Sequence, residues 1–140
     1  MARYLSLDMG AESGRLVIVE IASKISTEVL YRFETPITQD HRGRRCWDFP
    51  KIIEEVMHAL TLAAPHGPFE SLGVDTWGLD FGLLDENKEL VALPVSHRDH
   101  RTDGYLEKAF VIVGRDRLHF ETGAQLLEIN SIFQLLSITE

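Results

Sequence analysis

The sequence has little cysteine, no long apolar run and an excess of acidic over basic residues. Its single cysteine, Cys46, has no second cysteine to pair with, which excludes a small secreted domain held together by internal disulfides. No stretch approaches the roughly 18 apolar residues that a membrane-spanning helix needs, and the first residues lack the pattern of a signal peptide. We therefore expect a cytoplasmic protein.

The shortage of basic residues limits the classes of partner. The chain has 14 Lys and Arg against 22 Asp and Glu, which gives a formal net charge of -8. This charge repels phosphate backbones and anionic lipids, so we expect neither nucleic acid nor a membrane as a partner. It also opposes a bound nucleotide, which would therefore need local backbone donors and a metal ion. With 140 residues, of which 44% are hydrophobic, one domain or one lobe is the largest unit expected.

Runs of alternating or β-branched residues predict five strands. They span residues 3–8, 15–21, 27–33, 71–76 and 79–84. The first two are expected to form a β-hairpin whose turn is bounded by glycines. Residues 85–88 are expected to form a turn.

Apolar residues at helical spacing predict three helices. The first begins near Asp48 and Pro50, the second begins at Thr102 or Asp103 and ends at Gly114, and the third begins at Asn130. In the first helix, the apolar stripe is expected to comprise Ile53, Val56, Met57, Leu60 and Ala64. In the third, it is expected to comprise Ile132, Phe133, Leu135 and Leu136.

The segment from Asp8 to Arg15 lies between the two predicted hairpin strands and is the most informative part of the chain. Gly10 and Gly14 permit backbone angles that other residues avoid, and the residues between them are expected to present their N–H groups to phosphate oxygens. These residues are Ala11, Glu12 and Ser13. Arg15 adds a positive charge, and Asp8 is suited to hold Mg²⁺ through water. The alternative is a plain hairpin turn with a surface Asp and Arg.

The segment from Gly73 to Phe81 is a strand-like run interrupted by Trp77 and Gly78. The Trp77 ring offers a flat apolar face for a sugar, and Gly78 allows a ligand to approach the main chain. Asp75 and Asp80 are candidate acceptors for sugar hydroxyls. The alternative is a core tryptophan beside a β-bulge.

The densest polar cluster is residues 94–102. A metal site built from His97, Asp99 and His100 is disfavoured, because arginines flank these residues and their spacing matches no established ligand pattern. Arg98 or Asp99 is a candidate for lining a polyol pocket through charge-assisted hydrogen bonds. The alternative is a solvated loop that starts a helix.

Together these segments resemble the N-terminal region of the FGGY carbohydrate kinases, and within that family they look like rhamnulokinase. The resemblance implies an α/β fold, the N-terminal lobe of an actin/hexokinase-like (ribonuclease H-like) ATPase domain. It rests on the following runs: Asp8–Arg15, Trp47-Asp48, Gly73–Phe81, Leu93-Pro94, Arg98–Thr102 and Thr122-Gly123.

The resemblance also implies ligands and their contacts. ATP phosphates would contact residues 11–15, that is Ala11, Glu12, Ser13, Gly14 and Arg15. The ketose would contact Gly78, with Trp77 beside it, and Asp8 would anchor Mg²⁺ through water. Glu12 departs from the family, which more usually has a small residue there.

Members of the family are much longer and have two lobes, so residues 1–140 resemble only the N-terminal part of the first lobe, with motifs at 8–15 and 73–81. The general base of the family has no counterpart here, so we expect no catalytic residue in this chain and no activity from it alone. The resemblance implies that the longer kinase transfers the γ-phosphoryl group of ATP to the 1-hydroxyl of L-rhamnulose.

Two alternative functions and one assembly state are also consistent with the sequence. The sugar is alternatively another ketose or polyol, such as xylulose or fuculose, or the chain is a non-catalytic interaction module with an actin-like half-fold. Uncovered strand edges and the apolar stripe of the third helix favour self-association, and we expect a homodimer.

Overall fold

The computed structural model describes residues 1–139, which divide into two compact units. The first unit comprises residues 1–37 and 47–78, and the second comprises residues 38–46 and the described residues from Leu79 onward. Each unit has a hydrophobic core of its own.

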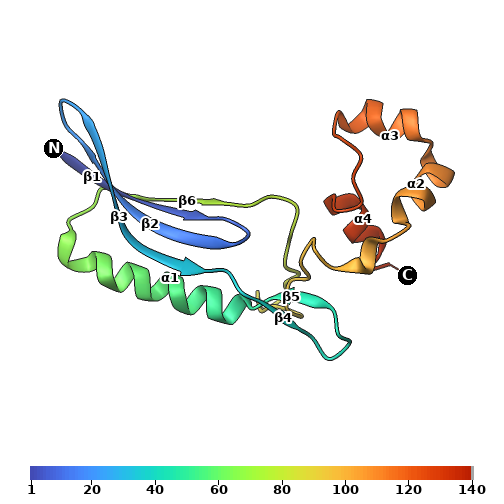
Figure 1. Ribbon diagram of the computed structural model, residues 1–140, viewed down its shortest axis with the longest axis horizontal. Coiled ribbons are helices and arrows are strands. Elements are labelled where there is room, and N and C mark those ends of the chain that lie inside the picture. The colour runs from blue at the N-terminus through green and yellow to red at the C-terminus, as the bar shows by residue number, and fades with distance from the viewer. Residues whose placement is uncertain (140) are drawn as a thin grey trace. The chain divides into compact units, whose positions relative to one another are not determined.

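The first unit is built on a four-stranded sheet in the order β3-β2-β1-β6 (Figure 1). Its strands are β1 (Ala2–Met9), β2 (Ser13–Ile21), β3 (Ile25–Glu34) and β6 (Leu72–Thr76). The β1–β2 and β2–β3 pairs are antiparallel, and β6 runs parallel to β1. The predicted hairpin, the third strand and the strand at 71–76 are confirmed.

Helix α1 (Phe49–Ala63) lies along one face of this sheet (Figure 1) and is followed by η1 (Ala64–His66). Its predicted start is confirmed, because the Asp48 side chain accepts a hydrogen bond from the Lys51 N–H at 3.2 Å. The core comprises Leu5, Leu7, Leu16, Ile18, Phe33, Ala59 and Ala63. The alternation of β1 and β2 therefore places every second residue, including the buried leucines and Ile18, on the face toward α1.

The predicted apolar stripe of α1 is partly wrong. Ile53 and Met57 are exposed, whereas Ile52, Ala59 and Ala63 are buried. Val56 and Leu60 of the predicted stripe are partly buried and pack against the same core as Ala59 and Ala63. The small side chains of the two alanines let the helix approach the sheet closely.

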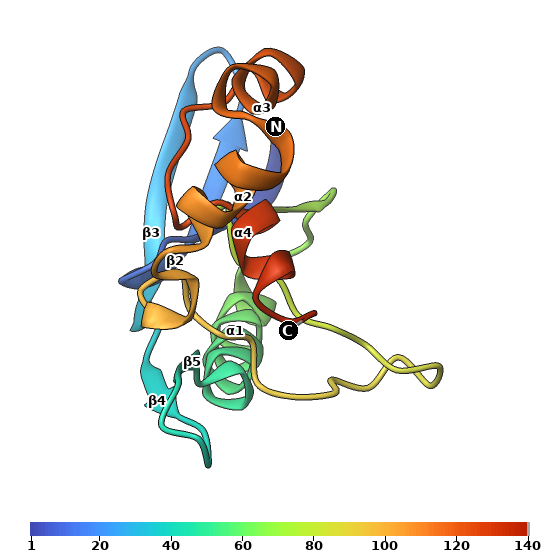
Figure 2. The same cartoon turned by 90° about the vertical axis from the view of Figure 1, so that its right-hand side faces the viewer.

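The second unit contains η2 (His100–Thr102) and the helices α2 (Tyr105–Val113), α3 (Arg115–Thr122) and α4 (Ser131–Leu136) (Figure 2). Its core comprises Ala109, Leu118 and Phe133. The two short strands β4 (Ile37–Gln39) and β5 (Arg45–Trp47) pair with each other. Helix α2 starts and ends close to the predicted positions and α4 starts directly after Asn130, as predicted, but α3 was not predicted.

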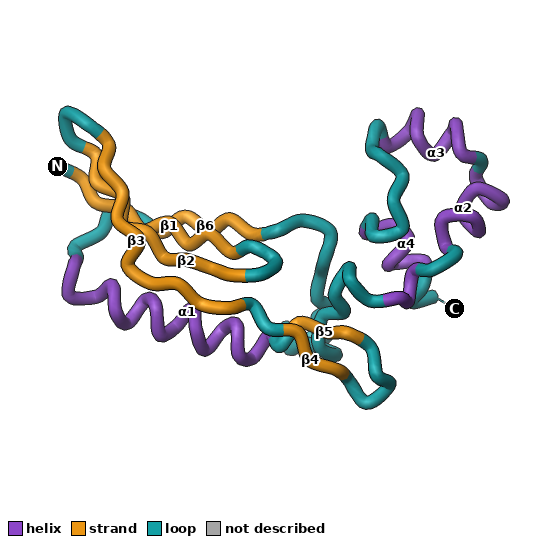
Figure 3. Tube along the Cα trace, viewed as in Figure 1, coloured by secondary structure: helices purple, strands orange, loops and turns teal. Residues whose placement is uncertain are grey.

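The predicted strand at 79–84 is wrong. Figure 3 shows loop through most of the segment between β6 and η2, where Leu84 and Leu90 form an isolated bridge. Leu79 has a φ of 82°, which breaks the extended path of the chain. The turn at 85–88 is confirmed, since the Asp85 carboxylate accepts hydrogen bonds from two backbone N–H groups in and just after the turn. Within residues 1–139, no helix is both long enough and apolar enough to span a bilayer.

Candidate functional site

The turn that joins β1 to β2 is fixed by a residue that directly follows β3. The Gly10 N–H donates to the Ser13 carbonyl at 2.9 Å, which closes the turn. Thr35, which is buried, donates its hydroxyl to the Gly10 carbonyl at 3.0 Å and its N–H to the Glu12 carbonyl at 3.3 Å. Thr35 thus holds the predicted phosphate-binding turn in place. Sequence reasoning missed it because a threonine 25 residues away carries no local signal.

Asp8 and Arg15 form a cross-strand ion pair at the base of this turn. They are paired in the β1–β2 register, and both Nε and Nη2 of Arg15 lie within 2.8 Å of Asp8 Oδ2. The two side chains remain 38% and 45% exposed, so the pair adds little stability. Its effect is to fix the direction of the guanidinium group and to leave the second carboxylate oxygen of Asp8 outside this contact.

Asp75 lies beside Asp8 on the neighbouring strand. The parallel β1–β6 register pairs these two residues, which places their Cα atoms about 4.8 Å apart on the same face of the sheet. Carboxylate oxygens on adjacent strands are the hard ligands that Mg²⁺ prefers. The two carboxylates therefore suit a magnesium ion held through water. The sequence analysis named Asp75 as a candidate acceptor for sugar hydroxyls and did not predict that it lies beside Asp8.

The predicted reason for a glycine at position 14 is wrong. Neither Gly10 nor Gly14 is among the glycines with positive φ, which are Gly43, Gly104, Gly114 and Gly123. Gly14 is instead buried beneath the Phe33 ring, and a Cβ at this position would overlap that ring. Packing between β2 and β3, and not an unusual backbone angle, requires glycine here.

Trp77 continues from the end of β6 and packs against a second tryptophan. Its N–H donates to the Met9 carbonyl at 3.1 Å, and its ring centroid lies 4.6 Å from that of the buried Trp47. Gly78 is exposed, and no atom lies within 4 Å of the position that its Cβ would occupy. Trp77 therefore has a packing role, and the space at Gly78 is open to a ligand.

The rest of the 73–81 segment belongs to the second unit, where Asp80 makes contacts within the protein. Its carboxylate is 5% exposed and lies 2.8 Å from His97 Nδ1, and it accepts a longer bond of 3.4 Å from Gln134 Nε2. Asp80 is thus engaged as a structural acceptor, although the sequence suggested a sugar contact.

The 94–102 cluster ties β5 to η2. The Asp99 carboxylate accepts hydrogen bonds from the backbone N–H groups of Arg45 and Arg101, and the Arg98 carbonyl accepts one from the Arg45 side chain. His100 is exposed and pairs with Asp103 at 3.2 Å. No group of three or more metal-binding side chains occurs among residues 1–139. The arrangement matches the loop network that was the alternative interpretation.

Comparison with known proteins identifies the relatives of this chain. No family model matches it. A rhamnulokinase of Mannheimia succiniciproducens is 35% identical over 96% of the chain, and one of Halalkalibacterium halodurans is 39% identical over 96%. The chain is therefore similar in sequence to proteins named rhamnulokinases. It spans 29% of the length of these curated relatives.

The fold agrees with this relationship. The xylulose kinase of Lactobacillus acidophilus superimposes with a TM-score of 0.82 over 100% of the chain and 29% of its own length. At 15% identity this likeness shows the fold alone. The predicted α/β fold, that of the N-terminal region of actin/hexokinase-like sugar kinases, is confirmed.

Proposed function

We propose that this chain supplies the nucleotide-phosphate contacts and part of the sugar contacts of an ATP-dependent rhamnulokinase. In the longer kinase, the γ-phosphoryl group of ATP would be transferred to the 1-hydroxyl of L-rhamnulose, in the cytoplasm. The observation that carries the proposal is the pairing of Met9 with Thr76 at the ends of two parallel strands. The turn after β1 and the Trp77-Gly78 segment after β6 therefore leave the sheet side by side, as a reaction between two bound molecules requires.

On the nucleotide side, residues 11–15 would contact the phosphates, with Arg15 held in position by Asp8. Asp8 would hold Mg²⁺ through water, with Asp75 as its neighbour. When bound, the ion would neutralise part of the phosphate charge. This matters here because the chain has a net charge of -8, which repels a nucleotide. Glu12 is exposed at the tip of the turn.

On the sugar side, the open space at Gly78 would accept the ketose against the main chain, and the half-buried Trp77 ring would form a wall of the site. The comparisons favour rhamnulose, because the relatives at 35–39% identity are named rhamnulokinases, whereas the likeness to a xylulose kinase rests on the fold. They do not favour a non-catalytic interaction module.

A chimaeric kinase tests the proposal. This chain would replace the matched 139 residues of the Mannheimia succiniciproducens rhamnulokinase, and the purified chimaera would be assayed with ATP against L-rhamnulose, L-fuculose, D-xylulose and glycerol. We expect turnover with L-rhamnulose as the best substrate. A folded chimaera that prefers another of these sugars would assign the chain to a different kinase, and one that turns over none of them would contradict the proposal.

We also propose that the isolated chain forms a homodimer. The face formed by α2 and α4 carries an apolar groove of ≈280 Å³. Ile132 and Leu135 on this face are 47% and 49% exposed, whereas Phe133 is fully buried within its own unit. A second copy that covers the first two side chains would remove this exposed apolar surface from water.

A further inference from the structure

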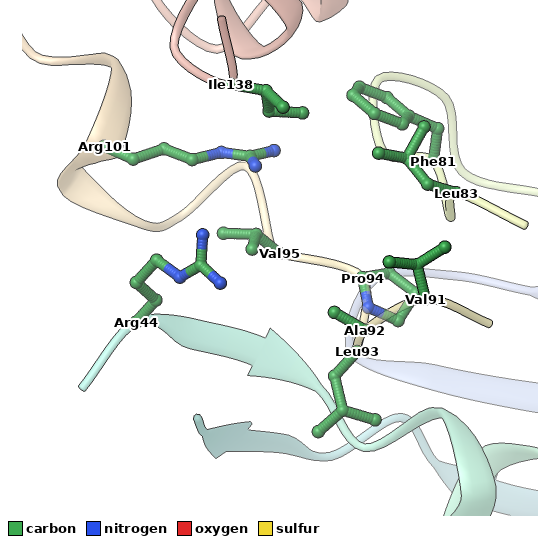
Figure 4. A pocket seen from close by; sticks show the side chains of 10 residues that line it. All are labelled: Arg44, Phe81, Leu83, Val91, Ala92, Leu93, Pro94, Val95, Arg101 and Ile138. Atoms are coloured by element: carbon green, nitrogen blue, oxygen red, sulfur yellow. The ribbon is translucent and has the colours of Figure 1, made fainter. Parts of the chain in front are cut away.

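A second pocket, of ≈170 Å³, lies entirely within the second unit (Figure 4). Its walls are mainly apolar and include Phe81, Leu83, Val91 and Pro94. Two guanidinium groups enter it from different segments, Arg44 from the residues before β5 and Arg101 from η2. An apolar pocket with two cationic groups has the composition of a site for an organic anion.

Arg101 has an unmet hydrogen-bonding group in this pocket. Its Nε is buried and has no hydrogen-bond partner among residues 1–139. Its Nη2 donates to the Gln134 side-chain oxygen at 2.6 Å, which is a neutral acceptor, and its guanidinium lies 6.0 Å over the Phe81 ring. Burial lowers the pKa of Arg101; the nearby Asp99 and Asp80 charges raise it, and the Arg44 charge lowers it. A buried donor without an acceptor is costly, so this group is a strong candidate for ligand contact.

Arg44 is oriented by a carboxylate outside the pocket lining. Its Nε donates to Asp40 Oδ2 at 2.7 Å, and its Nη2 lies 2.7 Å from the same oxygen. Partial burial opposes ionisation of Asp40, but hydrogen bonds from Arg44 and Arg42 lower its pKa to about 2. Arg44 is therefore balanced by a carboxylate, and Arg101 is the cation whose bonded partner is neutral.

We propose that this pocket binds a small carboxylic acid anion with a short branched apolar body. The carboxylate would accept hydrogen bonds from Arg101, including its Nε, and the apolar body would lie against Phe81 and Leu83. Liquid water occupies about 30 Å³ per molecule, so the pocket volume suits roughly five to six non-hydrogen atoms. A planar carboxylate matches the guanidinium fork, and the apolar walls favour a hydrocarbon body over a fully hydrated anion.

This inference is independent of the proposed kinase function. The pocket contains none of residues 8–15 or 73–78, which carry the nucleotide and sugar proposals. Failure of one proposal therefore leaves the other untouched.

Nuclear magnetic resonance of the arginine side chains tests the proposal directly. The ¹⁵N-labelled chain would be titrated with sodium 2-methylpropanoate, which has six non-hydrogen atoms, and the Nε–Hε signals of Arg101 and Arg44 would be followed. We expect a saturable shift of the Arg101 signal with a dissociation constant of roughly millimolar order, and binding at least about tenfold weaker for 2-methylpropanamide, which has the same shape without the charge.

Variants separate the binding contact from general effects on folding. Arg101→Met is expected to abolish the saturation, whereas Arg42→Met, which removes an exposed arginine nearby, is expected to leave it unchanged. Should Arg101→Met fail to fold, Leu83→Trp offers a second route, because Leu83 is 46% exposed and a larger ring there would fill the pocket.

Several outcomes would overturn the inference. They are the absence of a saturable shift with the acid, equal binding of the amide, tighter binding of inorganic phosphate than of the acid, and unchanged binding in a folded Arg101→Met or Leu83→Trp variant.

Discussion

The ring of Phe33 on β3 occupies the space that a side chain on Gly14 of β2 would need. The two residues are paired in the β2–β3 register, and Phe33 is 6% exposed in the core of the first unit. Gly14 thus has a structural role, because its lack of a side chain lets the Phe33 ring from the neighbouring strand lie over β2 and reach the core.

Gly14→Ala is therefore expected to destabilise the protein. The added methyl group would push the Phe33 ring out of position, and overpacking of this kind costs about 1–3 kcal/mol. Urea denaturation of the isolated chain would measure the loss. Gly73→Ala is the matched control, because it lies in β6 and no atom lies within 4 Å of its Cβ position. Equal stabilities of the two variants would show that Phe33 does not constrain Gly14.

The sequence predicted most of the first unit, because its strands alternate clearly and Asp48 marks the start of α1. It did not predict α3, in which Leu118 is the buried residue and only the exposed Phe120 is otherwise apolar. It also predicted a strand at 79–84, since nothing local reveals that Leu79 turns to a positive φ and that its carbonyl accepts bonds from Ser131 and Gln134. Long-range contacts of this kind override local preference.

The sequence predicted which residues lie at the candidate site better than it predicted what each of them contacts. Asp8 and Arg15 were named separately, but their ion pair follows from the strand register, which the sequence does not state. Thr35 and Gln134 carry no motif, although both are buried and make several hydrogen bonds. Polar residues that are far from a turn or loop in the sequence but hydrogen-bond to it can be recognised only once the fold is known.

The Asp40–Arg44 pair is expected to make stability depend on pH. The pKa of Asp40 is lowered from 3.8 to about 2 in the folded protein, so its contribution is complete above about pH 4 to 5 and is lost as the pH falls toward 2. Carboxyl ¹³C shifts would give the pKa directly. Arg44→Gln is expected to raise it, whereas Arg42→Gln should not, because Arg42 donates through its backbone N–H. An Asp40 pKa that is unchanged in Arg44→Gln would contradict this explanation.

The apolar face of α4 is expected to control self-association. Leu135→Asp places a charge on the exposed groove and should convert a dimer to a monomer in light scattering over a range of protein concentrations. Phe120→Asp is the control, because Phe120 is 85% exposed on α3 and does not line the groove. A monomer for the unmodified chain at high concentration would refute the dimer, and dissociation by Phe120→Asp alone would place the contact elsewhere.

The isolated chain is expected to have no kinase activity, because phosphoryl transfer depends on positioning both substrates and the chain spans 29% of the length of the rhamnulokinases it matches. Coupled detection of ADP in the presence of L-rhamnulose would test this. Asp8→Ala serves as the control for a contaminating kinase, since activity that survives this change does not come from the chain. Sugar-dependent ADP release that disappears in Asp8→Ala would prove the expectation wrong.

The central claim is that the turn after β1 contacts the nucleotide and the segment after β6 contacts the sugar. Separate KM values for ATP and for L-rhamnulose, measured in the chimaeric kinase, test this claim most directly. Arg15→Gln removes a charge-assisted contact, which is worth about 1.5–3 kcal/mol, and should raise the KM for ATP by roughly one to two orders of magnitude. The KM for L-rhamnulose should stay within about twofold, while Gly78→Val should produce the opposite pattern by filling the open space at Gly78. A rise in the L-rhamnulose KM with an unchanged ATP KM in Arg15→Gln would contradict the account.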